Sequence, residues 1–389
     1  MSALALVALL ATAPLLLVLV QSMAAGLAHM RQRRRKPTDD AGLPSLRILM
    51  PAHEEAGTID ATLRQLKRVL HDDGVPATVT VIADNCSDNT AIQAQRHGVH
   101  VLQRDKDQQR GKGYALAWGM EQIATDPDWD AVVVMDADVI PDRGLFRALA
   151  RELRQSPVVQ SFNLIDHGDD PRSRLMALAW ALINCTRPLG RYALGGSGSI
   201  TGYGFGIRRE VMQQVPFAAN GALAEDLEHG LALVHAGYRV RPVPDAVVYS
   251  IAEGASTARS QRTRWEAGRL HAVLRWWPRL LMRPRWASLE SALDLLVPPL
   301  ALPGVVLIGV AALAAVSGDG TALILALVGC ALTLLALLLT CLVARLPISL
   351  LSSLAWAPVY LLWKLSLYLT PGFWQQRRWE RTHRQQELV

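Results

Sequence analysis

Apolar residues are concentrated at the two ends of this chain, and a mixed polar segment lies between them. Residues 2–28 are nearly uncharged, and their number is close to the ~20 residues with which a helix crosses the hydrocarbon core of a bilayer. Three further apolar stretches lie in the carboxy-terminal part, over 295–316, 322–343 and 348–369. This distribution predicts membrane-associated helices at both ends and a globular domain over 37–285.

Basic residues beside the apolar segments indicate the orientation of the chain. The cluster 31–36 follows the first apolar segment, whereas a cleaved signal peptide carries its positive charge before that segment. Residues 1–30 are therefore predicted to be an uncleaved transmembrane anchor of an integral protein of a bacterial-type inner membrane, with the domain 37–285 in the cytoplasm. The basic tail 371–389 is expected on the same side.

The position of that tail limits the number of spans. If every carboxy-terminal stretch crossed the membrane, the tail would lie outside the cell. We therefore expect three spans in all, with one stretch of the segment 291–370 lying in the membrane interface. Our choice is 348–369, because it carries Pro358, Lys364 and several aromatic residues.

The net charge of +6 at pH 7 does not indicate a nucleic-acid-binding protein, because the basic clusters flank apolar segments, where they usually contact anionic lipid. The four cysteines show no spacing typical of metal ligands, and two of them, Cys330 and Cys341, fall in the predicted span 322–343. The sequence thus predicts membrane lipid as a partner, and it predicts neither nucleic acid, a zinc site nor a disulfide framework.

Apolar strand-like segments and helical segments alternate in the domain 37–285. Strands are predicted over 46–50, 78–83 and 131–135, and helices over 58–70, 90–97, 113–124 and 227–236. Strands that alternate with helices pair mainly in parallel, and they hold ligands at their carboxyl ends. The predicted fold class is therefore α/β, with a Rossmann-like and mainly parallel sheet.

Two carboxylates stand directly after the strand 131–135, in the element Asp136-Ala137-Asp138. Together they can hold an oxygen-seeking cation such as Mg²⁺ or Mn²⁺, which offsets the charge of a diphosphate. An isolated element of this kind is equally compatible with a solvated turn at the end of a strand. The residues around it therefore decide its interpretation.

Polar residues also follow the other predicted strands. Pro51 and Glu54 come at the end of the first strand and Asp84 at the end of the second, so they are expected at the same sheet edge as Asp136. Lys112 lies between two glycines where the next helix opens, and backbone N–H groups with a lysine suit a phosphate. The spacing is not that of a P-loop.

Two later elements offer a base and a platform for a sugar. Glu225 and Asp226 precede the helix 227–236, and a carboxylate there can deprotonate an acceptor hydroxyl. Gln261, Arg264 and Trp265 belong to a basic and aromatic segment, whose guanidinium groups suit a diphosphate and whose indole suits a sugar ring. A helix cap and an interfacial aromatic belt are the alternative interpretations.

Two weaker features accompany these motifs. The glycine-rich stretch 195–206 would let a sugar approach the backbone closely, and a flexible loop is the alternative. His229 and His235 are expected on the surface of the helix 227–236 rather than as ligands.

Taken together, the motifs resemble those of family 2 glycosyltransferases of the cellulose, chitin and hyaluronan synthase type. The resemblance covers residues 46–269 and rests on Asp84, Asp136-Ala137-Asp138, Glu225-Asp226 and Gln261-Arg262-Thr263-Arg264-Trp265. It implies a membrane-anchored GT-A enzyme, an inverting and metal-dependent hexosyltransferase that uses a nucleotide diphosphate sugar.

The resemblance also implies residue roles. The expected nucleotide-sugar-binding residues are Pro51, Glu54, Asp84, Lys112, Asp136 and Arg264. The expected metal ligands are Asp136 and Asp138, with Mg²⁺ or Mn²⁺ as the cofactor. The expected catalytic residues are Asp226, as the general base, and Glu225. The expected acceptor-binding residues are Trp265 and Gln261.

The implied donor is UDP-glucose or UDP-N-acetylglucosamine, and the implied acceptor is a saccharide or a lipid-linked acceptor in polysaccharide or glycoconjugate biosynthesis. The predicted spans are fewer than those of synthases that extrude long polymers, so processive export by one chain is in doubt and an oligomer or an export partner stays open. A non-processive transferase that charges a lipid carrier or a glycolipid is the first alternative. A non-catalytic subunit and a nucleotidyltransferase are further alternatives.

Overall fold

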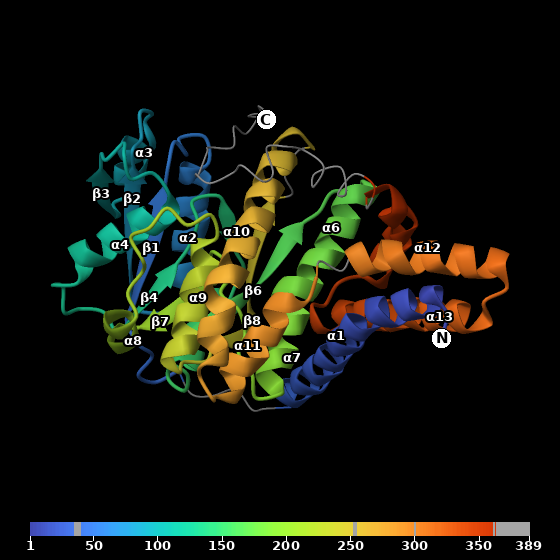
Figure 1. Ribbon diagram of the computed structural model, residues 1–389. Helices are drawn as coiled ribbons and strands as arrows, with labels where there is room; N and C mark the ends of the chain where they lie inside the picture. The colour runs from blue at the N-terminus through green and yellow to red at the C-terminus, as the bar shows by residue number, and fades with distance from the viewer. Residues whose placement is uncertain (35–39, 252–254, 299–300, 361, 363–389) are drawn as a thin grey trace.

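The computed structural model describes residues 1–34, 40–251, 255–298, 301–360 and 362, with side chains outside 251–263 and 301. In that part of the chain an α/β body adjoins a group of apolar helices, which projects from one side of it (Figure 1). The predicted tail 371–389 and residues 363–369 of the last apolar stretch lie outside the described residues.

The centre of the α/β body is an eight-stranded sheet with the strand order β3-β2-β1-β4-β7-β6-β8-β5. The strands are β1 (Leu46–Ala52), β2 (Ala77–Asp84), β3 (His100–Arg104), β4 (Ala131–Val134), β5 (Val139–Pro141), β6 (Val158–Asp166), β7 (Phe205–Arg208) and β8 (Arg241–Ile251). β1 pairs in parallel with β2 and β4, β2 with β3, and β6 with β8. β7 pairs antiparallel with β4 and β6, and β5 with β8. The predicted mainly parallel sheet is therefore a mixed sheet whose parallel block is β3-β2-β1-β4.

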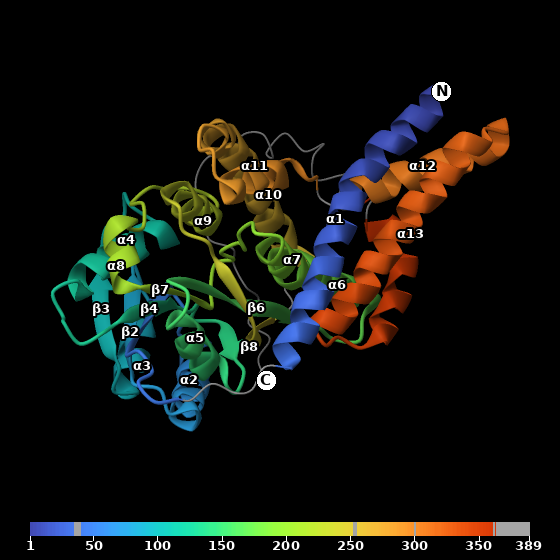
Figure 2. The same cartoon turned by 90° about the horizontal axis from the view of Figure 1, so that it is seen from below.

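Helices cover both faces of this sheet (Figure 2). One face carries α2 (Ile59–Asp73), α3 (Thr90–Arg96) and α5 (Leu145–Leu153), and the other carries α4 (Lys112–Ile123), α8 (Arg209–Gln214) and α9 (Glu225–Ala236). Successive side chains of β1 point to opposite faces. Ile48 and Met50 pack in one apolar layer with Leu63 of α2, whereas Leu49 packs in the other with Leu116 of α4.

The predicted elements of the parallel block are confirmed. The predicted strands correspond to β1, β2 and β4, and the predicted helices to α2, α3, α4 and α9, with bounds that agree within three residues. The largest difference is at α2, which continues to Asp73 and ends at Gly74, where a φ of 62° closes the helix.

The chain between β6 and β7 contains a helical part, 171–193, followed by the non-helical segment 194–204. The helical part comprises α6 (Pro171–Ala181), the π-helix η1 (Leu182–Thr186) and α7 (Arg187–Ala193). After β8, α10 (Ala255–Leu281) packs against α9 and against α11 (Trp286–Leu296). These helices lie between the sheet and the apolar helices (Figure 2).

The apolar helices are α1 (Ala3–Arg33), α12 (Ala301–Ser317) and α13 (Gly320–Val343), and they pack against one another (Figure 1, Figure 2). Among the described residues, α1 and α13 are the two helices that are long and apolar enough to cross a membrane. The predicted segments 2–28 and 322–343 are therefore single long helices, as expected.

The apolar stretch 295–316 is divided between two helices, and most of it lies in α12. α11 ends at Leu296 and α12 begins at Ala301, and the sequence has Pro298 and Pro299 between them. Proline lacks an N–H and disfavours helical backbone in the residue before it, so the helix is interrupted there. α12 has 17 residues and is about 26 Å long at 1.5 Å per residue, which is at the short end of the range of about 17–25 residues for transmembrane helices. The stretch predicted to be interfacial opens with the 3₁₀ segment η2 (Ile348–Trp356).

Candidate active site

The candidate site lies at the edge of the sheet where the parallel strands end. Pro51 lies near the end of β1, Asp84 is the last residue of β2, and Asp136 follows β4. β7 runs in the opposite direction, so the segment before it reaches the same edge, and the Gly204 N–H donates to the Val134 carbonyl at 2.7 Å. The residues at the ends of β1, β2 and β4 thus share one edge of the sheet with the segment before β7, which was not predicted to lie there.

Lys112 is the centre of the site. It is the first residue of α4, and its Nζ donates to a carboxylate oxygen of Asp136 and, at 2.7 Å, to the carbonyl of Gly202. Burial by itself would lower the pKa of Lys112, but the carboxylates of Asp136, Glu225 and Asp226 raise it above its ordinary value. The ammonium group therefore stays charged and joins α4, the end of β4 and the segment before β7.

Asp226 lies against the backbone of Gly202. It belongs to the first turn of α9, where its Oδ1 accepts from the Leu227 N–H at 2.8 Å. A Cβ on Gly202 would stand 3.3 Å from Asp226 Oδ2, and Gly202 has a φ of 82°, which side chains rarely adopt. A glycine is therefore required here both for its backbone conformation and for the close approach of the carboxylate.

Burial and mutual repulsion change the pKa values of the carboxyl groups. Burial raises the pKa of Asp226 and of Asp136, and Lys112 opposes both increases. Burial, followed by the charge of Asp226, raises the pKa of Glu225 to about 7. Both carboxyl groups of the pair Glu225-Asp226 are therefore harder to ionise than in water, and pKa values changed in this way are common at functional sites.

α10 brings Arg264 and Trp265 to the same region. A Cβ on Gly268 would stand 2.8 Å from Ala224 Cβ, so α10 packs closely on the residue before Glu225. Arg264 lies one turn earlier on α10, and its charge lowers the pKa of Glu225 and Asp226, although less than the other influences on them. Its Nε is buried and has no hydrogen-bond partner among the described residues.

Trp265 is half of an aromatic pair. Its ring centroid lies 5.4 Å from that of Trp180 on α6, with an interplanar angle of 41°, and 38% of Trp265 is exposed. An exposed indole face is available to a sugar ring. The side chain of Gln261, which is also predicted to bind the acceptor, lies outside the described side chains.

The residues predicted to bind the nucleotide have protein partners. Asp84 is buried and accepts from Arg104 Nη1 at 2.5 Å. Burial raises the pKa of Asp84, and Arg104 offsets part of that increase. Glu54, which has a φ of 54°, accepts from the Ser87 hydroxyl at 2.6 Å. Both carboxylates stand at the predicted edge of the sheet, where β1 separates β2 from β4.

The donor set at Asp136 and Asp138 fits a cation that arrives with its substrate. Within the described residues, no three His, Cys, Asp or Glu side chains converge into a metal-binding group. Mg²⁺ in proteins commonly uses one or two carboxylates, with substrate phosphates and water as the other ligands. Asp136 and Asp138, both half-buried, can supply those carboxylates.

No pattern in the sequence pointed to Trp180, and His229 does not lie where it was predicted. The prediction that His229 lies on the helix surface is wrong, because only 5% of this residue is exposed and its ring centroid lies 4.4 Å from that of Phe217. The loop that carries Phe217 covers this face of α9, and no periodicity in the sequence reveals such a cover. The one available signal was the spacing of three residues, which places His229 on the same helix face as Asp226.

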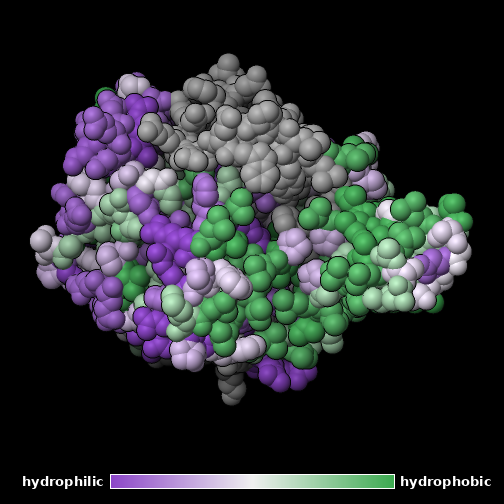
Figure 3. All heavy atoms as spheres, viewed as in Figure 1, coloured by the Kyte–Doolittle hydropathy of each residue, from purple (hydrophilic) through white to green (hydrophobic). Residues whose placement is uncertain are grey.

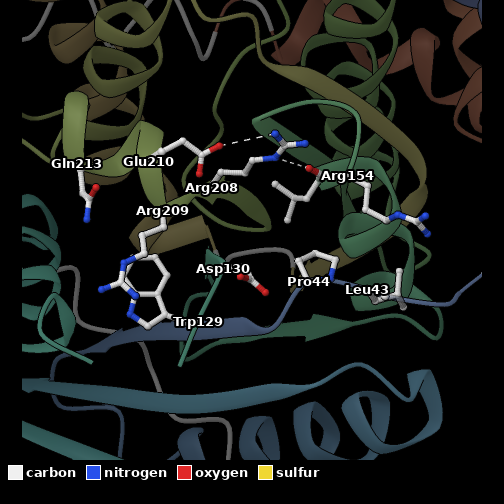
Figure 4. A pocket seen from close by; sticks show the side chains of 11 residues that line it. Leu43, Pro44, Trp129, Asp130, Arg154, Arg208, Arg209, Glu210 and Gln213 are labelled. Carbon is white, nitrogen blue, oxygen red and sulfur yellow. Dashed lines mark hydrogen bonds and ion pairs between the residues drawn. The ribbon is translucent and has the colours of Figure 1, made fainter. Parts of the chain in front are cut away.

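A larger hollow lies at the opposite edge of the sheet, where β1 and β4 begin (Figure 4). Its volume is about 580 Å³, but its basic side chains are engaged by the protein. The guanidinium of Arg209 lies 4.6 Å from the ring centroid of Trp129, and Arg208 donates to the Leu153 carbonyl at 2.5 Å. This hollow contains none of the predicted site residues, so its size does not identify it as the active site.

Comparison with known proteins supports a single family. The family model described as "Glycosyltransferase like family 2" matches residues 44–268. Probable glycosyltransferase YdaM of Bacillus subtilis is 26% identical over 244 residues, which cover 60% of this chain and 57% of that protein. Beta-monoglucosyldiacylglycerol synthase of Trichormus variabilis is 24% identical over 300 residues, which cover 73% of this chain and 63% of that protein. The alignments thus span less than two thirds of the length of either relative.

A solved structure has a similar fold. Mannosyltransferase PcManGT from Pyrobaculum calidifontis, in complex with GDP-Man and Mn²⁺, superposes with a TM-score of 0.50 and 18% identity, over 86% of this chain and 99% of that one. The family match contains all the residues that meet around Lys112, and it covers more than half of the 389 residues. The chain therefore belongs to glycosyltransferase family 2, and its α/β domain has the GT-A fold.

Proposed function

We propose that this protein is an inverting hexosyltransferase that moves a sugar from a nucleotide diphosphate donor, UDP-glucose or UDP-N-acetylglucosamine, to a saccharide or a lipid-linked acceptor. One observation carries the proposal: Lys112, Asp136 and the pair Glu225-Asp226 meet around the backbone of Gly202. In-line displacement at a sugar carbon needs a base on one side and positive charge beside the leaving group on the other.

In the proposed reaction, Asp226 accepts the proton of the acceptor hydroxyl while that oxygen attacks C1 of the donor sugar. The bond from C1 to the diphosphate oxygen breaks on the opposite side, so the configuration at C1 is inverted. Lys112 and Arg264 compensate the charge of the departing diphosphate. Glu225 is the neighbouring group that takes up a proton near neutral pH, which lets Asp226 remain a carboxylate.

The proposed cofactor is Mg²⁺ or Mn²⁺, held by Asp136 and Asp138. When bound, the cation would neutralise part of the diphosphate charge. Pro51, Glu54 and Asp84 are the proposed nucleotide-binding residues.

We further propose that the catalytic domain 37–285 lies at the cytoplasmic face of a membrane and is anchored by α1 and α13. Apolar side chains gather over α12 and α13 and continue toward α10 and α11 (Figure 3). Leu274 on α10 is 70% exposed, and Met282, the residue directly after α10, is 72% exposed. An apolar surface of this extent beside two long apolar helices suits contact with lipid.

The substitution Asp226→Asn tests the mechanism. The amide has nearly the same shape but cannot accept the proton, so we expect sugar transfer to fall by at least about 100-fold, the range typical of a lost general base. Release of UDP from the donor measures the transfer, and binding of UDP should remain within a few-fold of wild type. Glu210→Gln, a carboxylate-to-amide change at the opposite edge of the sheet, is the matched control.

Normal turnover by Asp226→Asn would remove this residue from the mechanism. Release of pyrophosphate in place of UDP would favour the nucleotidyltransferase, and the absence of any product would favour the non-catalytic subunit.

A glycolipid acceptor is the second candidate. Trp180, the partner of Trp265, lies on α6, and α6 packs against η2 on the side of the apolar helices. One relative, by its name, synthesises a glucosyldiacylglycerol. Sizing of the product made from radiolabelled donor separates one added sugar on a lipid from a long polymer, for which an oligomer or an export partner would be needed.

A further inference from the structure

A small cavity opens beside the catalytic carboxylates. Its lining includes residues of the candidate active site, namely Lys112, Gly202, Glu225 and Asp226. Its walls are mainly apolar and include Leu116, Phe205 and Phe217. The proposed mechanism assigns no role to the interior of this cavity.

His229 is one of the residues that line this cavity. It lies on α9 one turn after Asp226, its ring packs against Phe217, and only 5% of it is exposed. Its Nε2 is buried and has no hydrogen-bond partner among the described residues. Burial lowers the pKa of His229 to about 4, so the ring is neutral at physiological pH. A buried polar atom without a partner costs about 1–3 kcal/mol, so its presence beside an active site points to a ligand group that completes it.

The size and chemistry of the cavity limit what can enter it. Its volume is about 60 Å³, and since roughly 15 Å³ accommodates one water, it has room for about four non-hydrogen atoms. A hexose ring does not fit, but one substituent of the ring does. The neutral imidazole has one N–H and one lone pair. Depending on the tautomer, Nε2 can therefore accept a hydrogen bond from the N–H of an amide or donate one to its carbonyl. The apolar walls suit a methyl group.

We propose that this cavity receives the 2-acetamido group of the donor sugar, with His229 hydrogen-bonded to its amide, and that the protein uses N-acetylhexosamine donors in preference to hexose donors. The proposal rests on the transferase function proposed above. C2 is bonded to C1, the carbon that is attacked next to Asp226, so its substituent is well placed to reach a cavity that Asp226 lines. A hydroxyl at C2 would leave most of the cavity unfilled.

The test uses the full chain in lipid nanodiscs and matched pairs of donors. UDP release, from hydrolysis as well as transfer, is measured with UDP-N-acetylglucosamine against UDP-glucose, and with UDP-N-acetylgalactosamine against UDP-galactose. We expect kcat/KM to be at least about tenfold higher for the acetamido donor of each pair, the discrimination that one specific polar contact in a pocket provides.

Two variants test whether His229 is responsible for the preference for acetamido donors. His229→Phe keeps a ring against Phe217 but removes the polar nitrogen, so it should lower kcat/KM about tenfold for acetamido donors and change it less than about threefold for hexose donors. His229→Gln, which restores a hydrogen-bonding group, should recover part of the preference. His235→Phe, on the same helix but outside the cavity lining, should keep the wild-type ratio.

The inference is overturned if hexose donors are used as well as or better than acetamido donors, or if His229→Phe lowers activity equally for both. Unchanged binding of UDP shows that the variant is folded. If no donor yields UDP, or if Asp226→Asn turns over normally, the transferase proposal itself fails and the inference fails with it. A clear preference for hexose donors by an active, Asp226-dependent enzyme overturns the inference alone.

Discussion

Lys112 shows how strongly single residues at this site depend on one another. Its ammonium group donates to Asp136 and to the Gly202 carbonyl, while Glu225 and Asp226 also raise its pKa. Burial raises the pKa of each of these carboxyl groups, and the positive charge of Lys112 opposes that effect. The pKa values of these groups thus depend on a balance among all of them, and a bound diphosphate with its cation would change every member of the set.

Glu225 links this balance to stability. Its pKa is about 7 in the folded protein, against an ordinary value of 4.5, so the folded state holds an extra proton between these two pH values and loses stability as the pH rises through this window. In the Glu225→Gln variant the side chain is neutral at every pH, so no carboxylate is buried at high pH. We expect this variant to be more stable than wild type by about 1–2 kcal/mol at pH 8, and to differ little at pH 5.

Thermal unfolding of both proteins at the two pH values measures this difference. A gain in melting temperature that is larger at pH 5 than at pH 8 would contradict the assigned pKa. Glu210→Gln, at an exposed position far from the site, should show no such dependence on pH.

At the scale of elements, local sequence patterns and long-range pairing were not equally predictable. β1, β2, β4 and the helices between them were predicted because apolar periodicity and turn residues are local signals. Asp84 and Asp136 were placed correctly at one edge because parallel strands end together. The insertion of β7 beside β4 depends on contacts distant in sequence, and for that reason Gly202 was not placed at the edge. His229 was misplaced because tertiary packing, not helix periodicity, covers it.

The junction of α1, α7 and α11 is another feature that only the structure reveals. Ion pairs join α7 to α11. Arg187 Nη2 donates to Asp294 Oδ1 at 2.5 Å, and Arg191 Nε donates to Glu290 Oε1 at 2.6 Å. Arg187 Nε also donates to Gln21 Oε1 of α1 at 2.9 Å. The apolar helix α1 is thus hydrogen-bonded to the domain that contains the candidate active site.

Close packing of α1 on α7 leads to a prediction at this scale. A Cβ on Gly190 would stand only 1.8 Å from the Gln21 carbonyl oxygen, so Gly190→Ala must displace one of the two helices. We expect a loss of about 1–3 kcal/mol in stability, as is usual for overpacking. Gly309→Ala in α12 is the control, because its Cβ would meet nothing within 4 Å. Thermal unfolding in detergent compares them, and equal melting temperatures would show that α1 does not pack as described.

At the scale of the whole molecule, the two long apolar helices α1 and α13 lie side by side, and their ends lie at the same height at both ends of the pair. Arg345, just after α13, and Gln32 of α1 both bond Asp245 of β8, at 3.0 and 3.2 Å. At the other end, Ser2 bonds Asp319 in the turn before α13. α1 has 31 residues and is about 46 Å long, which exceeds the ~30 Å core, so its basic end at Arg31 and Arg33 can stand outside the bilayer beside the catalytic domain.

This geometry makes the orientation testable with single cysteines. Nucleotide-sugars are made in the cytoplasm, so the proposed function requires the catalytic domain there and the turn between α12 and α13 on the other side. Ser317→Cys, exposed at the end of α12 beside that turn, should react in intact cells with a membrane-impermeant maleimide above the level of the wild-type chain. Gln155→Cys, exposed on the catalytic domain, should react only after the cells are opened. Equal labelling of both cysteines in intact cells would show that these two parts of the chain lie on the same side of the membrane. The proposal that α1 and α13 cross the membrane would then be wrong.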